Sequence, residues 1–74
     1  MMKKIKFIGW KVGMNKIEFI QLLYNNTSVS LTESKKIKDR IVDGEDVELM
    51  VDDNEVKFIV DKAREYGLIV QIEE

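Results

Sequence analysis

Residues 15–36, NKIEFIQLLYNNTSVSLTESKK, indicate two helices separated by one polar break, and the first helix has more apolar residues than a single buried face requires. At 100° per residue, the apolar side chains from Ile17 to Tyr24 cover about 220° of the helix circumference, whereas a one-sided surface helix needs little more than about 100°. Two explanations are open. The second helix covers part of this excess, or one apolar strip stays exposed as a docking surface.

The rest of the chain alternates in a way that predicts three strands around these helices. Ile5 and Phe7 face away from Lys4 and Lys6, and the same period of two recurs in two later segments. Three helices packed on the apolar side of such a sheet would bury it. The sequence therefore predicts a single domain, residues 1–74, with a two-layer α+β fold of order βααβαβ, in which a three-stranded sheet has three helices on one face. The expected strands are 4–11, 46–51 and 68–72, and the expected helices lie near 15–26, 31–43 and 53–66.

Capping residues mark where the second and third helices begin. Ser30 stands three residues before Glu33, and Asp52 stands three residues before Glu55, which is the spacing of a capping box. The acidic residues around Asp52 also suggest a calcium loop as an alternative. A twelve-residue loop starting there would lack the glycine at its sixth position, and acidic residues in a first helical turn interact favourably with the helix dipole. We therefore expect capping rather than metal binding.

The residue types that are missing restrict the chemistry more than those that are present. The chain has no cysteine and no histidine, so it lacks a thiolate nucleophile, a sulfur-based zinc site and the commonest general base. Its four glycines are scattered and form no phosphate-binding loop. We expect no enzymatic activity, no cofactor and no metal.

Charge and hydropathy restrict the partners in the same way. A net charge of only −2 favours neither nucleic-acid binding nor a disordered tail. The basic start MMKK is followed by a short apolar run without a cleavage site, and no apolar stretch approaches the roughly 20 residues of a membrane span. The expected location is the cytoplasm, without membrane association.

Several short segments occur in the order and spacing of one known family. They are NK before an apolar helix at 15–16, TSVSLTESKK at 27–36, the acidic start of the last helix, and EYGLIVQIEE at 65–74. From residue 15 onward the chain thus resembles the C-terminal domain of the bacterial ribosomal large-subunit stalk protein. That resemblance implies the same element order, in a fold shared with the adaptor of the Clp protease. It also implies a non-enzymatic protein-interaction module that docks a protein partner through its first two helices, with a translational GTPase factor as one candidate.

Carried over position by position, the resemblance implies a partner surface on the first two helices. The implied partner-binding residues are Lys16, Ile17, Ile20, Gln21, Tyr24 and Lys35. The residues expected in the core instead are Phe19, Leu22, Leu23, Ile37 and Ile41. The two lysines keep the basic rim of the family, whereas Gln21 and Tyr24 stand where the family has basic residues, which reduces electrostatic steering of a partner.

Two other functions stay open. One is a small adaptor or inhibitor that uses the same fold on machinery other than the ribosome. The other is self-association through the outward face of the sheet, where Ile8, Met50 and Ile69 are expected, with Trp10 near its edge. Single exposed apolar residues are normal on monomers. We therefore expect a monomer or a weak homodimer.

Overall fold

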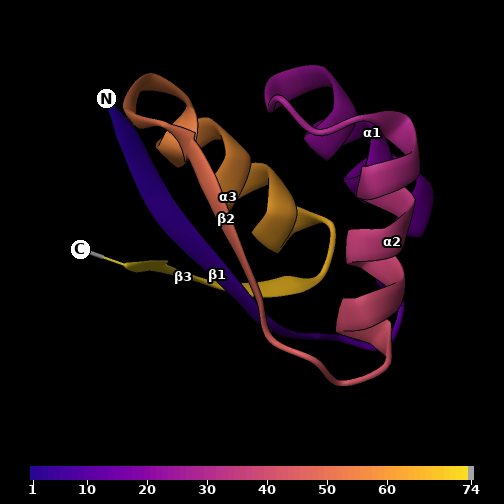
Figure 1. Ribbon diagram of the computed structural model, residues 1–74. Coiled ribbons are helices and arrows are strands. Elements are labelled where there is room, and N and C mark those ends of the chain that lie inside the picture. Colours follow the sequence, from indigo (N-terminus) through magenta and orange to yellow (C-terminus); the bar gives the residue numbers. More distant parts are fainter. Residues whose placement is uncertain (74) are drawn as a thin grey trace.

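The fold is known from a computed structural model, which describes residues 1–73 (Figure 1). Within these residues it has one three-stranded sheet and three α-helices in the order βααβαβ. The helices lie together on one side of the sheet in Figure 1. The predicted α+β fold class is confirmed. The elements are β1 Met2–Trp10, α1 Lys16–Asn26, α2 Leu31–Val42, β2 Val47–Asp52, the 3₁₀ turn η1 Asp53–Glu55, α3 Val56–Glu65 and β3 Leu68–Glu73.

The first strand is the centre of the sheet. The strand order is β2-β1-β3, and β1 is antiparallel to both of its neighbours. Phe7 lies opposite Val47 on one side and Val70 on the other, and all three are buried because they face the helices. An extra residue in β1 between Phe7 and Gly9 shifts its register against β3. That bulge was not evident from the alternation of the sequence.

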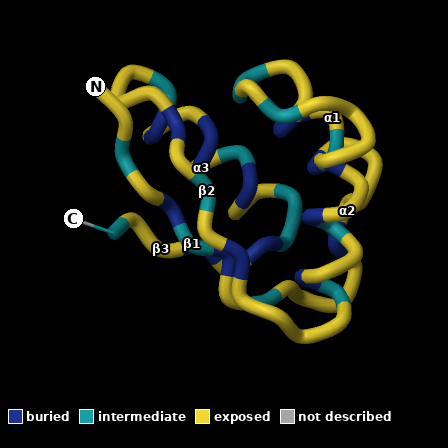
Figure 2. The backbone as a smooth tube through the Cα atoms, in the orientation of Figure 1, coloured by how far each residue is buried: buried dark blue, intermediate teal, exposed yellow. Residues whose placement is uncertain are grey.

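The core lies between the sheet and the helices, where the buried stretches of α1, α2 and α3 turn inward in Figure 2. The ring of Phe19 in α1 contacts the ring of Phe7 edge-on, with centroids 5.2 Å apart and planes inclined by 73°. Such aromatic pairs add about 0.5–1.5 kcal/mol beyond the burial of their area. The structure buries all five residues predicted for the core, namely Phe19, Leu22, Leu23, Ile37 and Ile41.

The second and third helices begin in different ways. The Ser30 hydroxyl accepts a hydrogen bond from the Glu33 amide at 3.1 Å, as predicted for an N-cap. The Asp52 carboxylate accepts from the Asn54 amide at 2.8 Å, and the chain first makes the η1 turn. The regular helix α3 therefore starts at Val56 rather than near residue 53, and the predicted Asp52–Glu55 capping box is wrong, because Asp52 caps the η1 turn instead.

The connection between β1 and α1 is fastened to the turn between α3 and β3. The Lys11 amide donates to the Gly67 carbonyl at 2.8 Å, and the Asn15 amide donates to the Tyr66 carbonyl, also at 2.8 Å. Gly67 has a positive φ of 97°, and a Cβ there would lie 3.0 Å from the Cα of Met14. A glycine is needed at this position for both its conformation and its close contact. The start of α1 is thus joined directly to the C-terminal part of the sheet.

None of the helices within residues 1–73 has the length and apolar content that crossing a bilayer requires.

Candidate protein-docking surface

Helix α1 has two apolar faces on opposite sides. With Ile17 at 0° and 100° per residue, the arc from about 140° to 240° holds its buried residues. These are Phe19, Leu22 and Leu23. The opposite arc, from about 300° to 40°, holds four residues that we call the α1 strip: Ile17, Ile20, Gln21 and Tyr24. One face therefore builds the core, and the other is the apolar excess noted in the sequence.

The α1 strip faces the solvent. Ile17 is 69% exposed and Tyr24 is 51% exposed, and Gln21 is exposed between them. Only Ile20 is partly covered. Ile17 and Tyr24 are two turns apart, about 10 Å along the helix axis. The second helix does not bury this excess, so the α1 strip is a surface feature rather than packing.

Local hydrogen bonds hold α1 and its strip in place. At the start of the helix, the Asn15 side chain accepts from the Glu18 amide at 3.2 Å. At its end, the Thr27 hydroxyl donates to the Leu23 carbonyl at 2.6 Å and accepts from the Val29 amide at 3.2 Å. Because both ends are capped by side chains, the strip belongs to a well-defined helix rather than to a loop.

Lysines lie on the same two helices as the strip. Lys16 is exposed in the first turn of α1, and Lys35 and Lys36 are exposed on α2, which packs beside α1. Within residues 1–73 none of these three lysines forms an ion pair. No hydrogen bond or ion pair there joins Lys35 to the α1 strip, so Lys35 contributes to the surface only through its charge.

The surroundings of the strip are more basic than the net charge suggests. Residues 1–42 contain nine of the twelve Lys and Arg residues and only three of the fourteen Asp and Glu residues. This excess was present in the sequence and the prediction missed it. Some of these basic residues lie on the sheet, where Lys4 and Lys6 pair with carboxylates of the later part of the chain. On α1 and α2 themselves, five basic residues stand against three acidic ones, so the two helices that carry the predicted site have an excess of positive charge.

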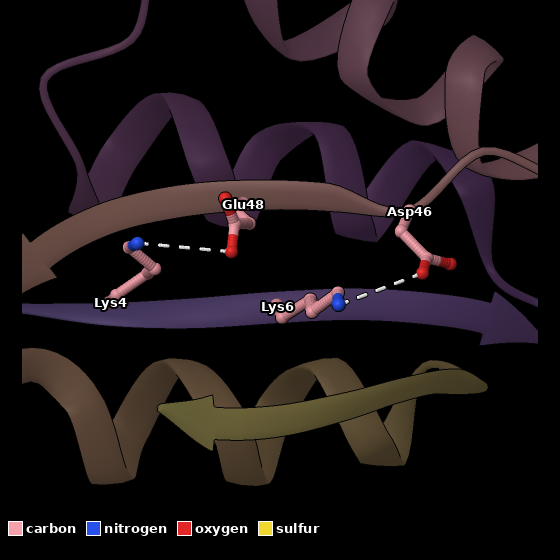
Figure 3. Close-up of polar contacts among 4 residues, drawn as sticks. All are labelled: Lys4, Lys6, Asp46 and Glu48. Atoms are coloured by element: carbon pink, nitrogen blue, oxygen red, sulfur yellow. Dashed lines mark ion pairs between the residues drawn. The ribbon is translucent and has the colours of Figure 1, made fainter. Parts of the chain in front are cut away.

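The open face of the sheet is built differently. The Lys4 ammonium lies 3.8 Å from a carboxylate oxygen of Glu48, and the Lys6 ammonium lies 3.8 Å from one of Asp46 (Figure 3). Both lysines come from the central strand β1 and both carboxylates from β2 or the residue before it. The charges in the middle of this face are therefore neutralised within the molecule.

The apolar residues predicted on the open face are exposed but separated. Ile8, Met50 and Ile69 are each partly exposed. Met50 lies on β2 opposite Lys4, whereas Ile69 lies on β3 opposite Gly9. The two edge strands are about 9–10 Å apart, with β1 and its lysines between them. Met50 is therefore separated from Ile69, so the three residues do not form one patch across the sheet, and this geometry gives no support to self-association through the whole open face.

Two shallow depressions occur elsewhere on the surface. One lies between the end of α1 and the end of β2 and includes Asn25 and Asp52, and the other lies between the β1–α1 and α3–β3 connections and includes Val12 and Tyr66. None of the six predicted partner-binding residues lines either depression. Within residues 1–73 no three carboxylates come close enough to hold a metal ion. The candidate site is therefore a convex helix face rather than a cleft.

Comparison of the chain with protein-family models, with curated proteins and with solved structures gives no match. The resemblance to the stalk-protein domain gains no support from these comparisons and stays a prediction that rests on the segments of the sequence.

Proposed function

We propose that the protein is a non-enzymatic docking module that binds a protein partner through the α1 strip. The main support is the 69% exposure of Ile17 and the 51% exposure of Tyr24 on a helix whose opposite face is fixed in the core. A helix face that presents anchors at i, i+3 and i+7 fits a groove on a partner. Binding would bury these side chains without rearranging the domain.

The chemistry of the surface suggests the chemistry of the partner. The strip offers apolar and aromatic contacts at its centre, and Lys16, Lys35 and Lys36 on α1 and α2 have no acidic partner within the described chain. A complementary partner has an apolar groove with acidic residues at its rim, because such charges speed association and exclude basic surfaces. The resemblance to the stalk-protein domain makes a translational GTPase factor the first candidate.

Direct binding to purified translational GTPase factors from the same organism tests this proposal. Tyr24→Ala should weaken the binding by more than about 1 kcal/mol, roughly fivefold in Kd, because Tyr24 is an anchor of the strip. Met50→Ala is the matched control, since Met50 is 46% exposed but lies on the open face of the sheet. Its Kd should equal that of the unmodified protein.

If no translational GTPase factor binds at micromolar concentration, the translational role is wrong. The adaptor or inhibitor alternative then has its own test, in which the unmodified chain and the Ile17→Lys/Tyr24→Lys double variant are used as baits in an extract. A partner identified with the first bait and lost with the second would support docking through the strip. Capture of the same proteins by both baits would show that the strip is not the docking surface.

A further inference from the structure

The two edges of the sheet differ in how they are protected against pairing with another strand. An exposed edge strand presents unpaired backbone groups that can accept a further strand. On the β2 edge, the strand itself carries two charged side chains, Glu48, which pairs with Lys4, and Asp52. On the β3 edge, residues 68–72 read LIVQI and include no charged side chain. By its sequence alone, β3 is the edge more prone to self-pairing.

The backbone groups of β3 that point away from β1 can be identified from the hydrogen-bond pattern. The Gly67 carbonyl accepts a hydrogen bond from the Lys11 amide, so residue 67 faces β1. In an antiparallel ladder the direction of these groups alternates along the strand. The N–H and C=O groups of Leu68, Val70 and Ile72 therefore point to the open side. Val70 is the middle one of these three positions.

The side chain of Arg64 binds the outward-pointing carbonyl of Val70. Its Nη2 donates a hydrogen bond to the Val70 carbonyl at 3.1 Å, from the last turn of α3. Within residues 1–73 Arg64 forms no ion pair, and the carbonyl is its hydrogen-bond partner. The guanidinium thus takes the acceptor that an incoming strand needs and adds a positive charge beside residues 68–72, which have none; the one charged residue of β3 is Glu73, at its end.

We propose that Arg64 guards the β3 edge and that, without it, β3 pairs with β3 of a second copy. In an antiparallel pair centred on Val70, each Val70 faces its counterpart, and Leu68 faces Ile72 of the other copy. Ile72 lies opposite the buried Ile5 yet is 41% exposed, and such a pair would cover it. Two Arg64 side chains would meet near the centre of this pair, so both the occupied carbonyl and the like charges oppose it.

Sedimentation velocity at concentrations up to several hundred micromolar tests this proposal. The unmodified protein should sediment as a monomer and Arg64→Ala as a dimer, with twice the mass. The matched control is Arg40→Ala. Arg40 is an exposed arginine on α2 that pairs with Glu45, away from the β3 edge. That variant should stay monomeric. The double variant Arg64→Ala/Ile72→Lys should return to a monomer, because it places a charge in the proposed interface.

Amide hydrogen exchange adds a readout that locates the contact. The amide of Val70 should exchange more slowly in the Arg64→Ala dimer than in the unmodified monomer. If circular dichroism shows that Arg64→Ala is unfolded, Arg64→Gln, which lacks the charge and the fork, replaces it. A monomeric Arg64 variant, a dimer that persists with Ile72→Lys, or an unmodified protein that already pairs through β3 would overturn the proposal.

Discussion

Helix α1 and the open face of the sheet both expose apolar side chains, but they differ in what surrounds those side chains. On α1, Ile17 and Tyr24 share one arc of the helix, and Lys16, Lys35 and Lys36 on α1 and α2 form no ion pair within the described chain. On the sheet, Met50 and Ile69 are separated by lysines that are already paired with Glu48 and Asp46. The surface on α1 therefore offers adjacent apolar side chains with unpaired lysines on the same pair of helices. The open face of the sheet offers separated apolar side chains with paired lysines between them.

This difference shows that the degree of exposure alone does not identify a binding surface. Met50 is 46% exposed and Tyr24 is 51% exposed, which are nearly equal values. What distinguishes them is contiguity, because a partner gains from apolar area that it can bury as one patch. Apolar residues divided by ion-paired charges instead cost the partner desolvation of those charges.

The two faces of α1 should respond very differently to truncation. Leu23→Ala should reduce the free energy of unfolding by about 2–5 kcal/mol, because Leu23 is fully buried in the core. Ile17→Ala should change it by less than about 1 kcal/mol, because Ile17 lies on the exposed arc. Urea unfolding followed by circular dichroism measures both values. A loss of similar size in both variants would mean that the strip serves packing rather than docking.

The cap of α2 should have an intermediate effect, because it orders the second of the two helices that carry the surface. Ser30→Ala should cost about 1 kcal/mol, within the usual 0.5–2 kcal/mol for an N-cap, since the Glu33 amide loses its acceptor. Ser28→Ala, in the same connection but without a capping bond among the described contacts, is the control. An equal loss of stability in both variants would speak against the capping role.

The ion pairs of the open face should contribute little. In a double-mutant cycle, Lys4→Ala and Glu48→Ala should couple by less than about 1 kcal/mol, because both side chains are about half exposed at 46% and 52%. The coupling should fall further when the salt concentration rises. A coupling of several kcal/mol would show that this face is a rigid structural element rather than a solvated surface.

Calcium should have no measurable effect. The Asp52 carboxylate already accepts a hydrogen bond from the Asn54 amide, with which it caps the η1 turn. Millimolar calcium should therefore leave the Tm unchanged, and a chelator should do the same. A rise of several degrees in a thermal scan would show that the acidic run around Asp52 binds the ion.

The sequence was sufficient for the element order and for the apolar excess of α1, because both depend on periodicity, but it left open whether the second helix covers that excess. The period of two defined the strands, and the excess of apolar residues from Ile17 to Tyr24 indicated a second face on α1 before its exposure was known. The five predicted core residues follow from the same patterns and are buried.

Other features depend on how distant parts of the chain meet, and the sequence did not reveal them. Leu31 is apolar but 43% exposed, because it lies at the first residue of α2, where fewer neighbours cover it. Met14 is buried beside Gly67, a contact between segments more than fifty residues apart. The hydrogen bond from Arg64 to the Val70 carbonyl likewise requires α3 to lie against the edge of β3. No local pattern encodes these positions. The partner is also undetermined by the pattern, because only the resemblance suggests a translation factor.

The fastening of the β1–α1 connection to the α3–β3 turn has a consequence for cooperativity. The amide of Asn15, the residue that caps α1, is bonded to the carbonyl of Tyr66, so the first helix begins on a support supplied by the last quarter of the chain. We therefore expect the first turn of α1 to be less ordered when that turn is lost. Local opening at the C-terminus should spread to the amides of the first turn of α1, which makes the two ends of the sequence one unit in hydrogen exchange.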